Sequence, residues 1–312
     1  MSGRLASSSD SRRLLDPEVV ASLRSMDLRA RLVVEGFLAG LHRSPYRGFS
    51  VEFAEHRQYI PGDEIKRIDW RVYGKTGRYY VREYEEETNL RALLILDVSG
   101  SMAWRGDGER SRPVAGVSKL QYGSYLAAAL AYLLIRQKDS VGLVVFNDRV
   151  RTYIPPRSAP GHLNVILDQL ARLEPGGETG LADALHELAE RVRRRGLIII
   201  VSDLWDEPGS VLNALRHFRH RRHEVIVFHV LHPGERELRF RGPVRLRDLE
   251  TGRELTVDSG TAASRYRESA RAFLDRLESD CHEARIDYHL LTTDQPYDRA
   301  LMAYLTHRHC LR

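Results

Sequence analysis

The chain has 312 residues and a formal net charge of +5, from 48 lysines and arginines against 43 aspartates and glutamates. Hydrophobic residues make up 42% and charged residues 29%, which is typical of globular proteins and excludes a collagen-like or wholly disordered chain. A charge of +5 interleaved over this length predicts no nucleic-acid binding. The two cysteines, Cys281 and Cys310, lack the spacing of metal ligands and exclude a disulfide scaffold.

The first segment, residues 1–14, is rich in serine and arginine and has no apolar stretch. This composition predicts a flexible tail and not a secretory signal. The longest mostly apolar run, 126–135, is about half as long as a bilayer-spanning helix requires. We therefore expect a cytoplasmic protein without membrane insertion.

Residues 15–90 are predicted to form an N-terminal appendage of helices and short strands. From Asp16 to about Gly40, apolar residues recur at helical spacing. The following block, 48–87, alternates polar and aromatic residues and is interrupted by Pro61-Gly62-Asp63, which favours short strands and turns.

Residues 91–312 are predicted to form a doubly wound α/β domain with a mainly parallel sheet. Its strands are apolar at nearly every position and alternate with helical patterns. Such strands are typical of a sheet that is covered by helices on both faces. A small β insert is expected at about 236–258. The expected strands of the sheet are 92–96, 141–146, 150–154, 197–201, 225–231 and 286–291.

Three loops that leave this sheet carry oxygen-bearing side chains. Ligands of open α/β sheets bind beyond the carboxyl ends of the strands, where these loops are expected to meet. Hydroxyls and carboxylates without histidine or cysteine are hard ligands, which suit Mg²⁺ or Mn²⁺ better than zinc. The candidate residues are Asp97, Ser99 and Ser101 in the first loop, Thr179 in the second and Asp203 in the third.

The order of these residues resembles the metal-ion-dependent adhesion site of von Willebrand factor type A domains. In that family the first strand ends in Asp-x-Ser-x-Ser, as residues 97–101 do, and a threonine and a second aspartate follow from later loops. The resemblance implies that Ser99, Ser101 and Thr179 ligate the ion, with the two aspartates holding it directly or through water. A vacant coordination position would then favour a carboxylate from a partner protein. This predicts an interaction module and not an enzyme.

A second resemblance lies in the N-terminal block. Glu52-Phe53, the run 57–63 and the run 67–70 resemble the signature of DUF family 58, an uncharacterised bacterial family in which this signature precedes a von Willebrand A-like domain. Members are commonly encoded beside MoxR-type AAA+ ATPases, which implies such an ATPase or its client as the partner. No catalytic activity is established for the family, so the resemblance implies none.

The same block has two interpretations, which do not exclude each other. It could brace the sheet through ion pairs between its arginines and acidic residues, or it could dock a partner. The candidate docking residues are Arg57, Tyr59, Asp63, Arg67, Asp69 and Trp70.

Three alternatives remain for the Asp97 loop. Its residues could simply cap a turn and the next helix. The domain could also be a scaffold with a vestigial metal site. A haloacid-dehalogenase-like phosphatase would need a second aspartate two residues after the nucleophile, but position 99 is serine and no suitably placed lysine is evident.

Overall fold

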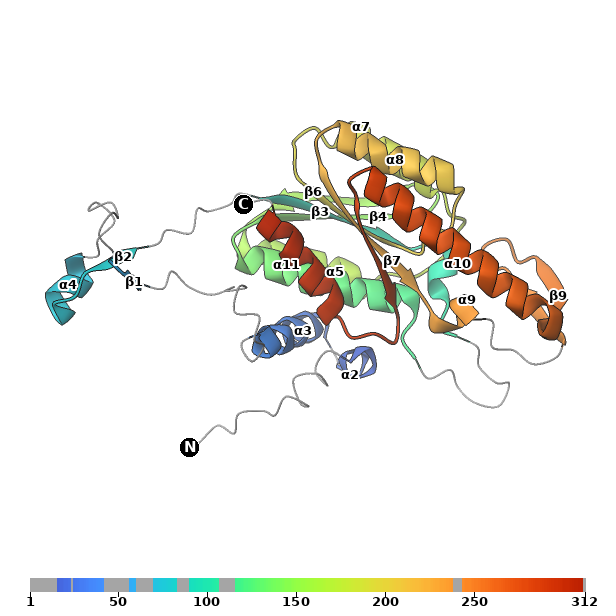
Figure 1. The fold of residues 1–312 in the computed structure, drawn as a ribbon, viewed down its shortest axis with the longest axis horizontal. Coiled ribbons are helices and arrows are strands. Elements are labelled where there is room, and N and C mark those ends of the chain that lie inside the picture. The colour runs from blue at the N-terminus through green and yellow to red at the C-terminus, as the bar shows by residue number, and fades with distance from the viewer. Residues whose placement is uncertain are drawn as a thin grey trace.

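The structure is a computed structural model that describes residues 16–23, 25–41, 56–59, 70–82, 90–106, 116–237 and 243–310. Its main body is a six-stranded sheet with helices on both faces (Figure 1). The strands lie in the order β10-β7-β6-β3-β4-β5. Their bounds are Arg91–Asp97 for β3, Ser140–Phe146 for β4, Val150–Arg157 for β5, Leu197–Ser202 for β6, Glu224–Leu231 for β7 and Asp287–Thr292 for β10.

All neighbouring strands of this sheet are parallel except β4 and β5, which are antiparallel. Only residues 147–149 separate β4 from β5, and so short a connection can join only antiparallel strands. The other strands are joined through helices, as parallel strands require. The predicted fold class, a mainly parallel α/β sheet with a helical and β appendage and a small β insert, is confirmed.

The sheet separates two hydrophobic cores, and β3 contributes to both of them. Leu94 and Leu96 face one core, whereas Leu93 and Ile95 face the other. Because side chains alternate along a strand, a strand that is buried on both faces is expected to be apolar along its length, as β3 is from Ala92 to Leu96. The first core is covered by α3 (Met26–Leu41), α5 (Lys119–Arg136), α6 (Pro160–Ala171) and α11 (Asp298–Cys310). The second is covered by α7 (Leu181–Arg191), α8 (Pro208–His220) and α10 (Ser259–Glu283).

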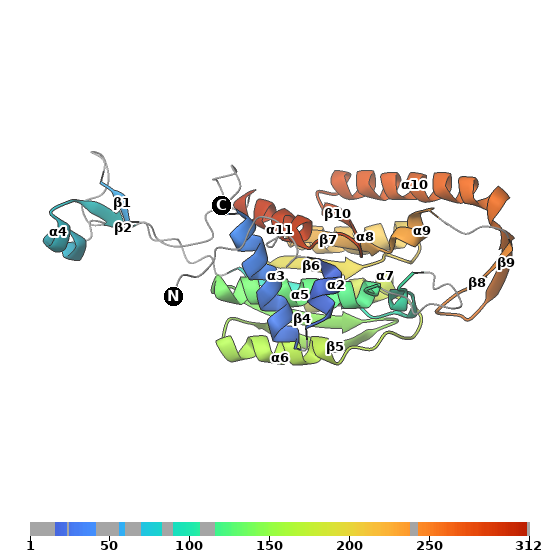
Figure 2. The same ribbon diagram turned by 90° about the horizontal axis from the view of Figure 1, so that it is seen from below.

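The first part of the appendage packs against α5. Helix α2 (Pro17–Ala21) begins at Asp16, whose carboxylate accepts a hydrogen bond from the Glu18 amide at 2.9 Å. The guanidinium of Arg29, in α3, lies 4.6 Å from the centre of the Tyr125 ring in α5. It also donates to the Ala21 carbonyl, which ties α2 to α3. The two helices thus add a layer outside α5 (Figure 2).

The rest of the appendage includes β1 (His56–Gln58), α4 (Trp70–Thr76) and β2 (Tyr80–Arg82). Strands β1 and β2 form an antiparallel pair. The sequence favoured only strands and turns in this block, and helix α4 differs from that expectation. The aromatic residues of this block contact one another, since the ring centres of Tyr73 and Tyr79 stack at 4.4 Å and the Trp70 ring meets that of Tyr73 edge-on at 6.0 Å.

The β insert is a hairpin of β8 (Pro243–Arg247) and β9 (Glu254–Asp258), which lies beyond the short helix α9 (Pro233–Glu237). Asp248 closes the connection, because its carboxylate accepts hydrogen bonds from the Glu250 amide at 2.8 Å and the Thr251 hydroxyl at 2.5 Å. These bonds lower the pKa of Asp248. They also fix the chain on both sides of Glu250. We call residues 248–251 the hairpin turn.

Among the described residues, no helix is both long enough and apolar enough to cross a membrane.

Candidate metal-binding site

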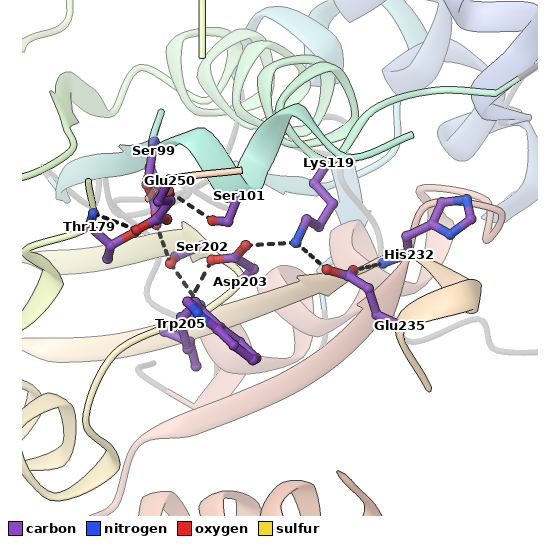
Figure 3. Close-up of polar contacts among 12 residues, drawn as sticks. Ser99, Ser101, Lys119, Thr179, Ser202, Asp203, Trp205, His232, Glu235 and Glu250 are labelled. Carbon is purple, nitrogen blue, oxygen red and sulfur yellow. Dashed lines mark hydrogen bonds and ion pairs between the residues drawn. The ribbon is translucent and has the colours of Figure 1, made fainter. Parts of the chain in front are cut away.

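The candidate site lies where the sheet changes winding direction. After β3 the chain adds β4 on one side and later returns to add β6 on the other. Such a switch point leaves a crevice beyond the carboxyl ends of the two central strands, because their connections leave in opposite directions. Asp97 ends β3, and Asp203 directly follows β6. The predicted residues therefore lie at the edge of the sheet where this topology places a ligand, and Figure 3 shows Ser99, Ser101, Thr179 and Asp203 there.

Asp97 is fully buried and organises the first loop. One of its carboxylate oxygens accepts the Ser99 amide at 2.8 Å, and the other accepts the Ser202 hydroxyl at 2.6 Å. The loop then enters a 3-10 turn, Gly100–Ala103, which places the Ser99 and Ser101 hydroxyl oxygens 3.0 Å apart. Adjacent ligands of an octahedral Mg²⁺ ion, bound at about 2.1 Å, are about 3 Å apart. The two hydroxyls thus have the spacing of neighbouring ligands.

Asp203 is paired with a buried lysine, Lys119, which corrects the expectation that no suitably placed lysine accompanies the Asp97 loop. The ammonium of Lys119 lies 2.7 Å from the Asp203 carboxylate and 2.5 Å from that of Glu235, and only 2% of the lysine side chain is exposed. Lys119 is the first residue of α5 and directly follows the N-cap Ser118, which forms a capping box with Gln121. Glu235 comes from α9, where its second oxygen accepts the His232 amide at 2.6 Å.

The carboxylates of this centre outnumber its cations. Burial and the neighbouring charge of Asp203 raise the pKa of Asp97 to about 7. Burial would raise the pKa of Asp203, but the charge of the Lys119 ammonium and hydrogen bonds from Lys119 and Ser101 together lower that pKa. Burial raises the pKa of Glu235 despite the same ammonium. One lysine thus serves Asp203 and Glu235, while Asp97 receives hydrogen bonds but no ion pair among the described residues. A further cation would offset this surplus.

Thr179 already binds a carboxylate of the same chain. One oxygen of Glu250 accepts the Thr179 hydroxyl at 2.6 Å, and the other accepts the Thr179 amide at 2.9 Å. The loop that carries Thr179 is held against the first loop, because the Gly176 amide donates to the Val98 carbonyl at 2.8 Å and the Gly100 amide to the Gly177 carbonyl at 3.0 Å. Figure 3 shows Glu250 beside Thr179.

Gly100 makes room for this contact. A Cβ atom at position 100 would lie 2.9 Å from the Leu249 carbonyl oxygen and 3.2 Å from the Glu250 side chain. A carbon atom that close to a backbone oxygen would force the hairpin turn to move. The hairpin turn therefore rests on the bare backbone of the Asp97 loop.

All five residues predicted as metal ligands lie in the described part of the chain, on the loops expected. The Asp97 loop and Asp203 meet at the strand ends, and the hydrogen bonds between the loops bring Thr179 beside them. Among the described residues, no group of three or more His, Cys, Asp or Glu side chains is arranged to hold a metal ion. A metal here would therefore depend on the serine and threonine hydroxyls together with the two aspartates, as the resemblance implies.

Three residues of the site, Lys119, Glu235 and Glu250, were not predicted from the sequence. Lys119 could have been predicted, because a cation at the first position of a helix is unfavourable beside the positive end of the helix dipole. Such a lysine therefore indicates that carboxylates lie nearby. Glu250 could not have been predicted, since it lies in a polar turn 71 residues from its partner Thr179.

The structure places only part of the predicted docking set. Asp63, Arg67 and Asp69 lie outside the described residues, and Arg57 is described only as backbone in β1. The ring of Tyr59 lies 6.2 Å from that of Tyr79. Trp70 is 57% exposed and presents an aromatic surface.

A sheet of this topology, with a hydroxyl-rich loop at its switch point, defines an α/β fold of the von Willebrand A-like type. The family model described as "Protein of unknown function DUF58" matches residues 55–276, and the chain belongs to this family. It is 31% identical over 253 residues to an uncharacterized protein from Mycobacterium tuberculosis, which covers 78% of this chain and 75% of that protein.

Two solved structures are similar at low sequence identity. The conserved hypothetical protein BatB from Bacteroides thetaiotaomicron has a TM-score of 0.46 and 15% identity, covering 72% of this chain and all of that one. The SpRpn10 VWA domain has a TM-score of 0.36 and 12% identity, covering 68% of this chain and 94% of that one.

Proposed function

We propose that this protein is a cytoplasmic, non-enzymatic interaction module that captures an acidic residue of a partner protein at the Asp97 site. The observation that carries the proposal is the Glu250 carboxylate, which already sits at Thr179 with both oxygens hydrogen-bonded. A site that holds a carboxylate of its own chain in this way offers the geometry to hold that of a partner in its place.

A divalent cation, Mg²⁺ or Mn²⁺, completes the proposed site. Ser99, Ser101 and Thr179 would ligate it through their hydroxyls, and Asp97 and Asp203 would hold it directly or through water. The surplus of carboxylates over cations and the 3.0 Å spacing of the serine hydroxyls support this assignment. The ion would supply a positive centre for the carboxylate of the partner.

The proposed partner is a MoxR-type AAA+ ATPase or a client of that ATPase, as family membership suggests. Two exposed tryptophans mark two possible docking surfaces. Trp205 is 67% exposed, and its amide lies 3.4 Å from the Asp203 carboxylate, so its ring stands at the rim of the site. Trp70 is 57% exposed on the N-terminal block. Exposed tryptophans beside a binding centre frequently contribute much of the energy of an interface.

The test is capture of partners by the full-length tagged protein from a lysate of its source cells, with Mg²⁺ in one arm and a chelator in the other. We expect an AAA+ ATPase or its client only with Mg²⁺, and its loss with Ser99→Ala and Trp205→Ala but not with Trp70→Ala. Capture of the same partner in both arms, with loss only in Trp70→Ala, would contradict the metal-bridged interface. It would support the alternative of a scaffold with a vestigial metal site.

The phosphatase alternative is tested separately. Asp97, the residue that would act as nucleophile, is fully buried, and both of its oxygens accept hydrogen bonds from the chain. We therefore expect no hydrolysis of p-nitrophenyl phosphate in the presence of Mg²⁺ above the level of Asp97→Asn. A rate that depends on Asp97 would overturn the assignment as a non-enzyme.

A further inference from the structure

The contact between Glu250 and Thr179 joins a surface hairpin to the candidate site across 71 residues of sequence. Both oxygens of the carboxylate are used, one by a hydroxyl and one by an amide of the same residue. Hydrogen bonds to a charged acceptor are stronger than those between neutral groups, so this contact favours one position of the hairpin turn.

Backbone contacts define the same position independently. The Leu249 carbonyl and the Glu250 side chain lie so close to Gly100 that a Cβ atom there would collide with the first. Gly100 in turn donates its amide to Gly177, in the loop that leads to Thr179. The surface formed by Gly100, Gly177 and Thr179 is therefore a seat shaped for a turn that carries a carboxylate.

The hairpin turn differs from the rest of the centre in burial. The ion pair between Lys119 and Asp203 is almost wholly buried. The hairpin turn, in contrast, lies at the surface, with Leu249 47% exposed and Asp248 and Thr251 exposed. When the hairpin turn undocks, water can form hydrogen bonds with the polar atoms that are uncovered. The hairpin turn can therefore leave the seat at a low cost in free energy.

We propose that the hairpin turn is an internal ligand that occupies, through Glu250, the seat used by the acidic residue of the partner. This inference rests on the proposed function for the identity of the competing ligand. It further specifies that ligand: an aspartate or glutamate presented on a turn, whose backbone can lie against Gly100 as that of Leu249 does. Binding of the partner then requires release of the hairpin turn.

A tethered ligand competes at a high effective concentration, of the order of millimolar for short tethers. The apparent affinity for an external ligand falls by the fraction of molecules whose seat is free. Removing the Glu250 carboxylate should therefore raise the affinity for an external acidic turn, by about tenfold or more if the seat is mostly filled.

The first measurement is hydrogen exchange at the Thr179 amide in the full-length protein without added metal. Glu250→Ala should speed exchange at Thr179 at least about tenfold, because the amide loses its acceptor. The matched control is Glu254→Ala in the same hairpin, since Glu254 pairs with exposed Arg245 and does not reach the site. Equal exchange at Thr179 in the wild type and Glu250→Ala would overturn the inference. Because this experiment needs neither metal nor partner, its result is independent of the proposed function.

The second measurement is binding of a fluorescent peptide with the sequence of residues 246–253, followed by anisotropy with Mg²⁺ and with a chelator. Glu250→Ala should bind it about tenfold more tightly than the wild type or Glu254→Ala, and a peptide with alanine in place of the glutamate should not bind. Gly100→Ala should expose Thr179 to exchange and yet fail to bind the peptide, because the added methyl group blocks the seat from either ligand.

The outcomes separate the two proposals. Tighter binding by Glu250→Ala in both Mg²⁺ and chelator would support the seat and contradict the role of the metal. Tighter binding only with Mg²⁺ would support both. Equal binding by the wild type and Glu250→Ala, or no binding by either, would overturn the internal ligand.

Discussion

The two sides of the candidate site hold their carboxylates in opposite ways. On the Asp203 side, the Lys119 ammonium is buried between two carboxylates, with 2% of its side chain and 1% of the Asp203 side chain exposed. On the Thr179 side, Glu250 reaches a neutral hydroxyl and an amide from an exposed turn. Removing one partner of a buried ion pair leaves an uncompensated charge away from water, whereas a surface contact can be replaced by water. The Asp203 side is therefore fixed structure, and the Thr179 side is the exchangeable half.

The largest expected effect follows from removing the buried cation. Lys119→Met keeps the length of the side chain but leaves Asp203 and Glu235 without a counter-ion. We expect the free energy of unfolding to fall by about 3–5 kcal/mol, the usual loss when a buried pair is broken from one side. Denaturant unfolding measures it. Arg245→Met, which removes one partner of an exposed pair, is the control and should change stability little. A Lys119→Met variant as stable as the control would show that the lysine does not hold the centre.

The second prediction concerns the coupling between the two buried partners. If the loss in Lys119→Met comes from the stranded charge of Asp203, then Asp203→Asn should relieve part of it. We expect the double variant to be more stable than the sum of the two single changes predicts, by about 1–3 kcal/mol. The same unfolding experiment on four proteins gives this coupling energy. Strict additivity would mean that the two side chains act independently, in conflict with their 2.7 Å contact.

The smallest effect on stability is expected on the other side of the site. Glu250→Ala should lower the free energy of unfolding by less than about 1 kcal/mol, because the turn is exposed and water can replace the carboxylate at Thr179. Glu254→Ala on the neighbouring strand serves as the reference. A loss comparable to that of Lys119→Met would make Glu250 part of the fixed structure and would remove the contrast between the two sides.

Residue patterns predicted the part of the site that depends on regular structure. Asp97 and Asp203 could be placed together because each closely follows a continuous apolar run, 92–96 or 197–201, and parallel strands end at the same edge. Ser99 and Ser101 follow Asp97 within four residues, so their position follows from its own. The same apolar runs, which alternate with helical patterns, also predicted a sheet covered by helices on both faces, and therefore a core on each side of it.

The remainder depends on contacts that no local pattern encodes. Lys119 reaches Asp203 over 84 residues and Glu235 over 116. Glu250 belongs to a hairpin whose own sequence predicts a turn but not where that turn docks. Helix α4 was missed because its seven residues, with aromatics and a glycine, lack the repeated apolar spacing by which longer helices are identified.

The central claim is that the hydroxyls beside Asp97 hold a divalent cation, and titration of the purified full-length protein with Mn²⁺ tests it most directly. Free Mn²⁺ would be followed by electron paramagnetic resonance in the wild type, in Ser99→Ala and in Ser210→Ala, a matched change at an exposed serine of α8. The account predicts one saturable site per chain that Mg²⁺ displaces, retained in Ser210→Ala and weakened at least about tenfold in Ser99→Ala. Absence of a saturable site in the wild type, or equal affinity in all three proteins, would contradict it.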